Sequence, residues 1–158
     1  MAVAMLAMVL AAPSVVGAQS VLPPWRVDPV TPPQRADIVV GETTLDVQLA
    51  TTPSLQQLGL GYRNGLDEGT GMLFVFSEAG DRTFWMKGMR FCLDIVWIEG
   101  GEIQGAAENV CPDPEGTSDG DRARFSSPVP VTYVLEVPGG WLAANGYGTG
   151  TTVELPES

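Results

Sequence analysis

The stretch around residues 93–109 constrains the fold more than any other part of the chain. Its centre is Gly100-Gly101, with an acidic residue on each side. Two glycines accept the positive φ angles that a two-residue turn between antiparallel strands requires. The pattern therefore predicts a hairpin with strands at Leu93–Glu99 and residues 102–109. Both faces of the first strand are largely apolar, which predicts a strand buried on both sides.

The remaining patterns predict a mostly β domain. Thr43–Ala50 alternates apolar and polar residues, as a half-buried strand does, and residues 37–40 are its expected hairpin partner. Thr52-Pro53 predicts the N-cap and first residue of a short helix that ends near Gly61. Further strands are expected at residues 71–76, 83–87, 131–137 and 151–155, with a turn at 78–81 and a short helical turn at 140–145. The expected fold class is α+β, with one or two short helices.

The N-terminal segment predicts export. Residues 1–12 are uncharged and apolar, and a small-residue pattern precedes Gln19, which is typical of a secretory signal peptide over residues 1–18. An uncleaved membrane anchor is the alternative, but the apolar run is short against the roughly 20 residues that a span requires. Five prolines mark residues 19–36 as an extended spacer. We expect one globular domain at residues 37–156, in the periplasm or outside the cell.

Charge excludes several classes of function. The chain has 8 Lys+Arg, 19 Asp+Glu and no histidine, for a net charge of −11. Such a field repels phosphate backbones and anionic lipids, so we expect no nucleic-acid partner and no membrane contact beyond the signal peptide. The absence of histidine excludes Ser-His and Cys-His nucleophiles and imidazole metal ligands.

No cofactor and no metal are expected. Four acidic residues lie in a loop rich in proline and glycine: Asp113, Glu115, Asp119 and Asp121. A calcium site is the alternative interpretation, because carboxylate oxygens bind calcium, but the spacing of these residues does not fit the twelve-residue helix–loop–helix pattern. A solvated acidic loop is the preferred interpretation.

The positions of the two cysteines, Cys92 and Cys111, can be compared with the strand pairing that the predicted hairpin implies. The Gly100-Gly101 turn pairs residues whose numbers add to 201, and those of the cysteines add to 203. They therefore lie close together where the hairpin opens, within one bulge of the register. In an exported protein this proximity predicts a structural disulfide, with two independent thiols as the alternative.

Charged residues among apolar ones mark the candidate site. Asp94 lies in the strand that is apolar on both faces, and Glu136 lies in the strand at residues 131–137. A buried carboxylate must be paired, hydrogen-bonded or protonated. Trp85 has the flat surface on which a sugar or another planar ligand stacks, although such residues more often belong to the core. The candidate ligand-binding residues are Arg63, Trp85, Lys87, Asp94 and Glu136.

A succession of motifs resembles the domain of unknown function family 192. In order they are Thr52-Pro53, Gly59-Leu60, Arg63, Gly71 to Phe76, Phe84 to Lys87, Leu93 to Val96, Leu135-Glu136, Gly140, Gly146 and Gly150. The resemblance covers residues 37–155 and implies a compact, barrel-like mixed sheet in an often exported protein. It implies no reaction, because the family has no established activity. The chain departs from the family at Gly88-Met89, where Asn-Thr is usual, and at Thr151, where Asp is frequent.

Three functions follow from these observations. We expect an exported domain that binds a small polar ligand or a cell-envelope partner. One alternative is a carboxylate-dependent hydrolase acting on an envelope saccharide, with Asp94 and Glu136 as acid and base. The other is a structural or interaction module in which partners satisfy both carboxylates. Carboxyl groups roughly 5–10 Å apart in an open pocket would favour the hydrolase.

Overall fold

The computed structural model describes residues 33–156. The predicted signal peptide at residues 1–18 lies outside the described residues, as does most of the predicted spacer at 19–36. Within the described part, the strands are β1 (Arg35–Val40), β2 (Thr43–Ala50), β3 (Thr70–Gly80), β4 (Thr83–Phe84), β5 (Leu93–Glu99), β6 (Glu102–Val110), β7 (Phe125–Ser126), β8 (Val131–Pro138) and β9 (Val153–Glu154). The helices are α1 (Pro53–Leu58) and α2 (Trp141–Asn145). Neither helix is long and apolar enough to cross a membrane.

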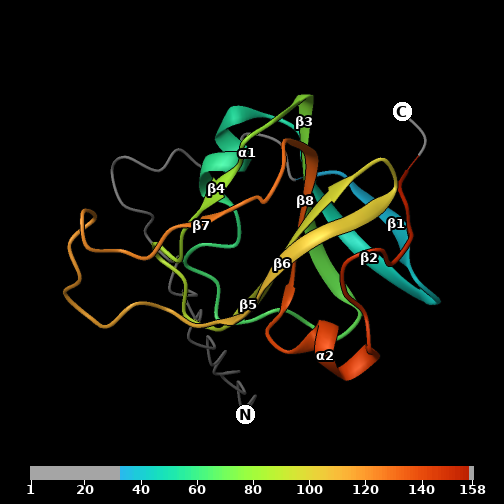
Figure 1. Cartoon of the computed structure of the whole chain (residues 1–158). Helices are drawn as coiled ribbons and strands as arrows, with labels where there is room; N and C mark the ends of the chain where they lie inside the picture. The colour runs from blue at the N-terminus through green and yellow to red at the C-terminus, as the bar shows by residue number, and fades with distance from the viewer. Residues whose placement is uncertain (1–32, 157–158) are drawn as a thin grey trace, which may run out of the picture.

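Seven strands form one strongly curled mixed sheet, in the order β6-β5-β8-β3-β2-β1-β9 (Figure 1). The pairing of β2 with β3 is parallel, and the other pairings in this sheet are antiparallel. Backbone hydrogen bonds join the two outermost strands near the Gly100-Gly101 turn, where Val153 N donates to Gly101 O and Ile103 N donates to Thr151 O. The sheet therefore closes on itself at this end, and the predicted barrel-like α+β fold is confirmed.

Apolar layers cover both faces of the curled sheet. Inside the curl, a barrel core draws side chains from strands around the sheet and from Leu142 of α2. On the other face, an outer core packs beneath α1 and β4, with Leu55 and Met86 among its members. The six residues from Leu93 to Ile98 are all buried, because β5 lies between these two layers. The prediction of a strand buried on both sides is confirmed.

The β5–β6 hairpin contains the predicted disulfide between Cys92 and Cys111. Glu99 pairs with Glu102 beside the turn, as the two glycines predict, and two register shifts then occur along the hairpin. These shifts bring Leu93 opposite Val110, so the next residues outward are the two cysteines. The bulges thus account for the difference between the register at the turn and the register at the disulfide.

Several predicted boundaries were wrong. The helix α1 ends at Leu58 rather than near Gly61, because Gly59 adopts φ 51° and stops the helical backbone. The predicted turn at residues 78–81 is largely strand, because β3 continues to Gly80 and pairs there with Val131. Of the strand predicted at residues 83–87 only β4 forms, and a turn at Gly88 follows it. Its partner β7 was not predicted.

Candidate functional site

The two predicted carboxylates lie on opposite faces of the sheet. Asp94 is on the same side of β5 as Val96, which belongs to the barrel core. Glu136 is on the same side of β8 as Val134, which belongs to the outer core. Successive side chains of a strand point to opposite faces, so the sheet itself separates the two groups. The structure does not bring them together in one pocket.

Asp94 is fully buried and satisfied by the backbone. Its Oδ1 accepts hydrogen bonds from Asn109 N at 2.6 Å and Gly140 N at 2.8 Å, and its Oδ2 accepts one from Leu142 N at 2.8 Å. These three hydrogen bonds satisfy both oxygens of the buried side chain. Asp94 thus holds the start of α2 and the end of β6 against β5, which is a structural role.

Glu136 has the opposite environment. Only 6% of its surface is exposed, and its Oε2 atom has no hydrogen-bond partner among the described residues. Its neighbours across the sheet are Met72 of β3 and Ile95 of β5, and neither side chain has an N–H or O–H group to donate to it. Burial raises the pKa of the Glu136 carboxyl to about 8, and the positive charge of Arg63 only partly opposes this effect. Glu136 is therefore protonated at neutral pH.

Arg63 approaches Glu136 without forming an ion pair within 4.0 Å among the described residues. Its guanidinium donates to Gln48 Oε1 at 2.9 Å. In the sheet register, Gln48 is opposite Met72, which is opposite Glu136, so two strand spacings of roughly 4.8 Å separate Gln48 from Glu136. Burial lowers the pKa of Arg63, and the charge interaction with Glu136 acts against that shift.

Trp85 and Lys87 follow β4 and lie beside the acidic loop. Trp85 is 36% exposed, which is high for such a large apolar side chain. The Lys87 Nζ lies 5.0 Å from the centre of the indole ring, and the Arg124 Cζ lies 4.1 Å from it. Lys87 also forms an ion pair with Asp119 of the loop. These contacts join the loop between β6 and β7 to two of the predicted site residues.

The acidic loop itself is crosslinked by its own charges. Arg122 contacts Asp113 at 3.0 Å and Asp119 at 3.1 Å, and Ser118 donates to Asp121 at 2.7 Å. Among residues 33–156, no group of three or more Cys, Asp or Glu side chains has the arrangement of a metal site. Asp113 and Asp119 thus organise the loop through Arg122 and Lys87.

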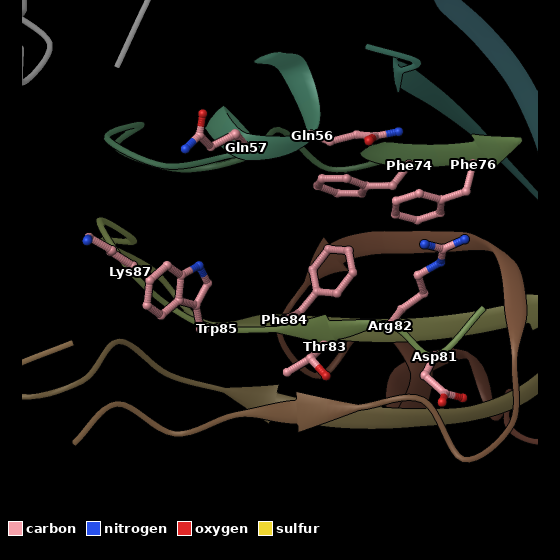
Figure 2. A pocket seen from close by; sticks show the side chains of 10 residues that line it. All are labelled: Gln56, Gln57, Phe74, Phe76, Asp81, Arg82, Thr83, Phe84, Trp85 and Lys87. Atoms are coloured by element: carbon pink, nitrogen blue, oxygen red, sulfur yellow. The ribbon is translucent and has the colours of Figure 1, made fainter. Parts of the chain in front are cut away.

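A pocket of about 470 Å³ opens between α1 and β4, and we call it the slot. Its lining residues are Gln56, Gln57, Phe74, Phe76, Asp81, Arg82, Thr83, Phe84, Trp85 and Lys87. In Figure 2, the two glutamines of α1 and the two phenylalanines of β3 lie on one side, and Phe84 and Trp85 lie on the other. A smaller hollow of about 50 Å³ adjoins the slot and has Glu136 in its wall. We call it the inner hollow.

Tertiary contacts fix both walls of the slot. Gln56 Nε2 donates to Ala50 O at 3.2 Å and to Val75 O at 2.8 Å, which holds α1 against β2 and β3. The rings of Phe74 and Phe84 meet edge to face, with centroids 4.9 Å apart. Arg82 lies 3.8 Å over the ring of Phe76 at the far end of the slot. The walls are thus held in place by the protein itself.

The structure brings Trp85, Lys87 and Glu136 together around the slot and its inner hollow, with Arg63 nearby. It leaves Asp94 on the other face of the sheet. Sequence reasoning missed the α1 glutamines and Phe84. The sequence did contain one signal for the glutamines. In the six-residue helix, Leu55 and Leu58 are the apolar positions, so the adjacent Gln-Gln pair lies on the remaining, polar part of the helix surface.

The sequence model of one protein family matches residues 35–155, nearly the whole described chain. This is the model of DUF192, described as "Uncharacterized ACR". The chain belongs to the DUF192 family. The predicted resemblance is thereby confirmed, and it extends across both walls of the slot. No curated protein matches the chain in sequence.

Two solved structures resemble this DUF192 domain. A proposed transcription regulator from Sinorhizobium meliloti 1021 is 32% identical, with a TM-score of 0.69, over 78% of this chain and 95% of its own. A protein of unknown function from Novosphingobium aromaticivorans DSM 12444 is 28% identical, with a TM-score of 0.71, over 82% of this chain and 91% of its own. Both similarities extend over nearly the whole of those proteins.

Proposed function

We propose that this DUF192 domain binds a small polar ligand in the slot, with the Glu136 carboxyl as the hydrogen-bonding group at its inner end. The observation that carries the proposal is the unpartnered Oε2 of Glu136 in the wall of the inner hollow. Buried polar side-chain atoms in proteins are almost always hydrogen-bonded, so an exception calls for an explanation. A bound ligand supplies the missing partner.

Asp94 offers an internal comparison. The same domain satisfies that buried carboxylate with three backbone N–H groups, so its fold is able to provide such partners. Glu136 receives none of them, although leaving a buried polar group unsatisfied costs about 1–3 kcal/mol. A purely structural module would gain stability from an apolar residue here. The hydrolase with Asp94 and Glu136 as its pair is not our proposal, since the sheet separates them.

We further propose that the domain works outside the cytoplasm. The disulfide between Cys92 and Cys111 supports an oxidising compartment, as do the signal-peptide features of residues 1–18. The Sinorhizobium protein is named as a transcription regulator, but we do not propose DNA binding for this domain. Its net charge of −11 opposes contact with phosphate backbones. Cell-envelope components are the corresponding source of ligands.

The test is thermal unfolding of the native protein with a panel of polar metabolites and saccharides. A ligand that binds only the folded state raises the melting temperature. We expect the shift to be lost in Glu136→Leu and reduced in Trp85→Ala, while Asp46→Asn, an exposed site on β2, keeps it. A ligand whose shift is the same in wild type and Glu136→Leu binds elsewhere and contradicts the proposal.

A further inference from the structure

The slot and the inner hollow are two parts of one cavity with different capacities. They share six lining residues: Gln56, Gln57, Phe74, Phe84, Trp85 and Lys87. Glu136 lines only the inner hollow, whose volume is about 50 Å³. A cavity needs roughly 10–15 Å³ to hold one water molecule, so the inner hollow has room for a small substituent of a ligand. The remainder of the ligand must lie in the slot.

The surroundings of the inner hollow favour an uncharged group there. Its wall includes Leu60, Phe74 and Met89, and burying a charge beside apolar side chains is costly unless it is paired. An ammonium group would lie near the positive charges of Lys87 and Arg63. A carboxylate would lose its hydration among these apolar side chains, and the guanidinium of Arg63 is already engaged with Gln48. A hydroxyl avoids both penalties, because it accepts a hydrogen bond from a protonated carboxyl and donates to an ionised one.

The slot has the surfaces that suit a ring with one apolar face and polar edges. The rings of Phe84 and Trp85 form one wall, and the Gln57 amide lies across from them (Figure 2). The Trp85 indole nitrogen is directed into the slot in the same view, where it provides a donor. A slot of about 470 Å³ is within the usual size range of small-molecule sites.

We propose that the ligand is a neutral saccharide whose ring lies in the slot, with one hydroxyl group in the inner hollow hydrogen-bonded to Glu136. This inference rests on the proposed ligand-binding function of the slot. The apolar face of the sugar ring packs against Phe84 and Trp85, and its remaining hydroxyls reach Gln57, Lys87 and the indole nitrogen. Glu136 is the one carboxyl group among the described residues that line the inner hollow. The carboxyl group of the slot itself, Asp81, lies beside Arg82 at the end away from Trp85 and points away from the aromatic rings (Figure 2), so it forms no acid–base pair with Glu136 and no bond of the saccharide is broken.

The test uses the full exported protein on an array of neutral mono- and oligosaccharides, followed by titration calorimetry with the strongest hit. We expect Glu136→Leu to weaken binding about fivefold or more, since it leaves the buried hydroxyl of the ligand without its hydrogen-bond partner. Glu136→Gln keeps a neutral donor and acceptor, so its affinity should stay within about threefold of wild type. Asp46→Asn is the control for unaltered binding, and circular dichroism checks the fold of each variant.

Two further probes, spermidine and citrate, distinguish failure of the saccharide inference from failure of the proposed ligand-binding function. No hit on the array overturns the saccharide inference, as does a hit that Glu136→Leu leaves unchanged. If spermidine or citrate instead binds in a manner that Glu136→Leu abolishes, the slot is a ligand site of another chemical class and the proposed function stands. If no saccharide and neither probe depends on Glu136, both the inference and the proposed function fail.

Discussion

Asp94 and Glu136 are both buried carboxyl groups, yet their surroundings differ. Asp94 accepts three backbone hydrogen bonds. Glu136 lies among apolar side chains and keeps a proton at neutral pH. The sequence predicted that each would need a partner. It did not reveal which one would find it, because the donors to Asp94 come from segments distant in the chain.

The raised pKa of Glu136 predicts a pH-dependent stability. The pKa moves from 4.5 to about 8, so between these values the folded chain holds a proton that the unfolded chain has released. The free energy of unfolding therefore falls as the pH rises through this window, and the fall ends above pH 8. Glu136→Gln removes this dependence and should be more stable than wild type by on the order of 3 kcal/mol at pH 7.

Urea denaturation of wild type and Glu136→Gln at several pH values measures this difference. The two proteins should be most alike below pH 4.5, where the glutamate is protonated in both the folded and the unfolded state. A constant difference in the free energy of unfolding across the range would show that Glu136 is not protonated in the folded protein at neutral pH.

Asp94 connects three elements of the fold, β5, β6 and α2. One side chain of β5 holds Asn109 at the end of β6 together with Gly140 and Leu142 at the start of α2. In Asp94→Asn, an amide NH2 group replaces one of the two carboxylate oxygens. A hydrogen-bond donor then faces the N–H donor of the backbone, and neither group has an acceptor. We expect a loss of about 3 kcal/mol or more in the free energy of unfolding, measured with urea.

The exposed Asp46 provides the comparison for this substitution. It pairs with Arg35 at 2.7 Å on the surface of β1 and β2. Exposed pairs contribute little, so Asp46→Asn should cost less than about 1 kcal/mol. Equal losses in the two variants would contradict the structural role that we assign to Asp94.

Local patterns predicted the elements that local chemistry determines. The Gly100-Gly101 turn, the alternation in β2 and the Thr52 N-cap each produced the expected element. The short pair β4 and β7 escaped prediction, since two-residue strands have no period to detect and depend on contacts between distant segments. The slot has the same origin, because its walls come from α1, β3 and β4. Sequence could nominate Trp85, but not the glutamines opposite it.

At the scale of the whole molecule, the disulfide acts on the unfolded chain. The bond between Cys92 and Cys111 spans a sequence separation of 19 residues, and a crosslink of this length stabilises the fold by about 3 kcal/mol in the chain-entropy model. Reduction should lower the denaturation midpoint accordingly. The variant with both cysteines replaced by serine should match the reduced wild type. An unchanged midpoint on reduction would mean that the crosslink adds no net stability.

The predicted fold class, the family and the disulfide are confirmed, because they follow from patterns that extend along most of the chain. The arrangement of the site was less accessible. Whether Asp94 of β5 and Glu136 of β8 share a face depends on the register between these two strands, which places Val137 opposite Asp94. Local sequence patterns do not specify that register, so the two carboxyl groups looked like potential partners although they lie on opposite faces of the sheet.

The pairing of β1 with β9 determines how the domain would respond to tension. The strands are antiparallel, so the chain enters β1 and leaves β9 at the same end of the pair, and only Val39 and Val40 pair with Glu154 and Val153. A pulling force on the two ends would peel these bonds apart one after another instead of shearing them together. For a domain tethered at both ends, the pairing of β1 with the short edge strand β9 is thus the mechanical weak point, and the strands that carry the slot would be loaded later.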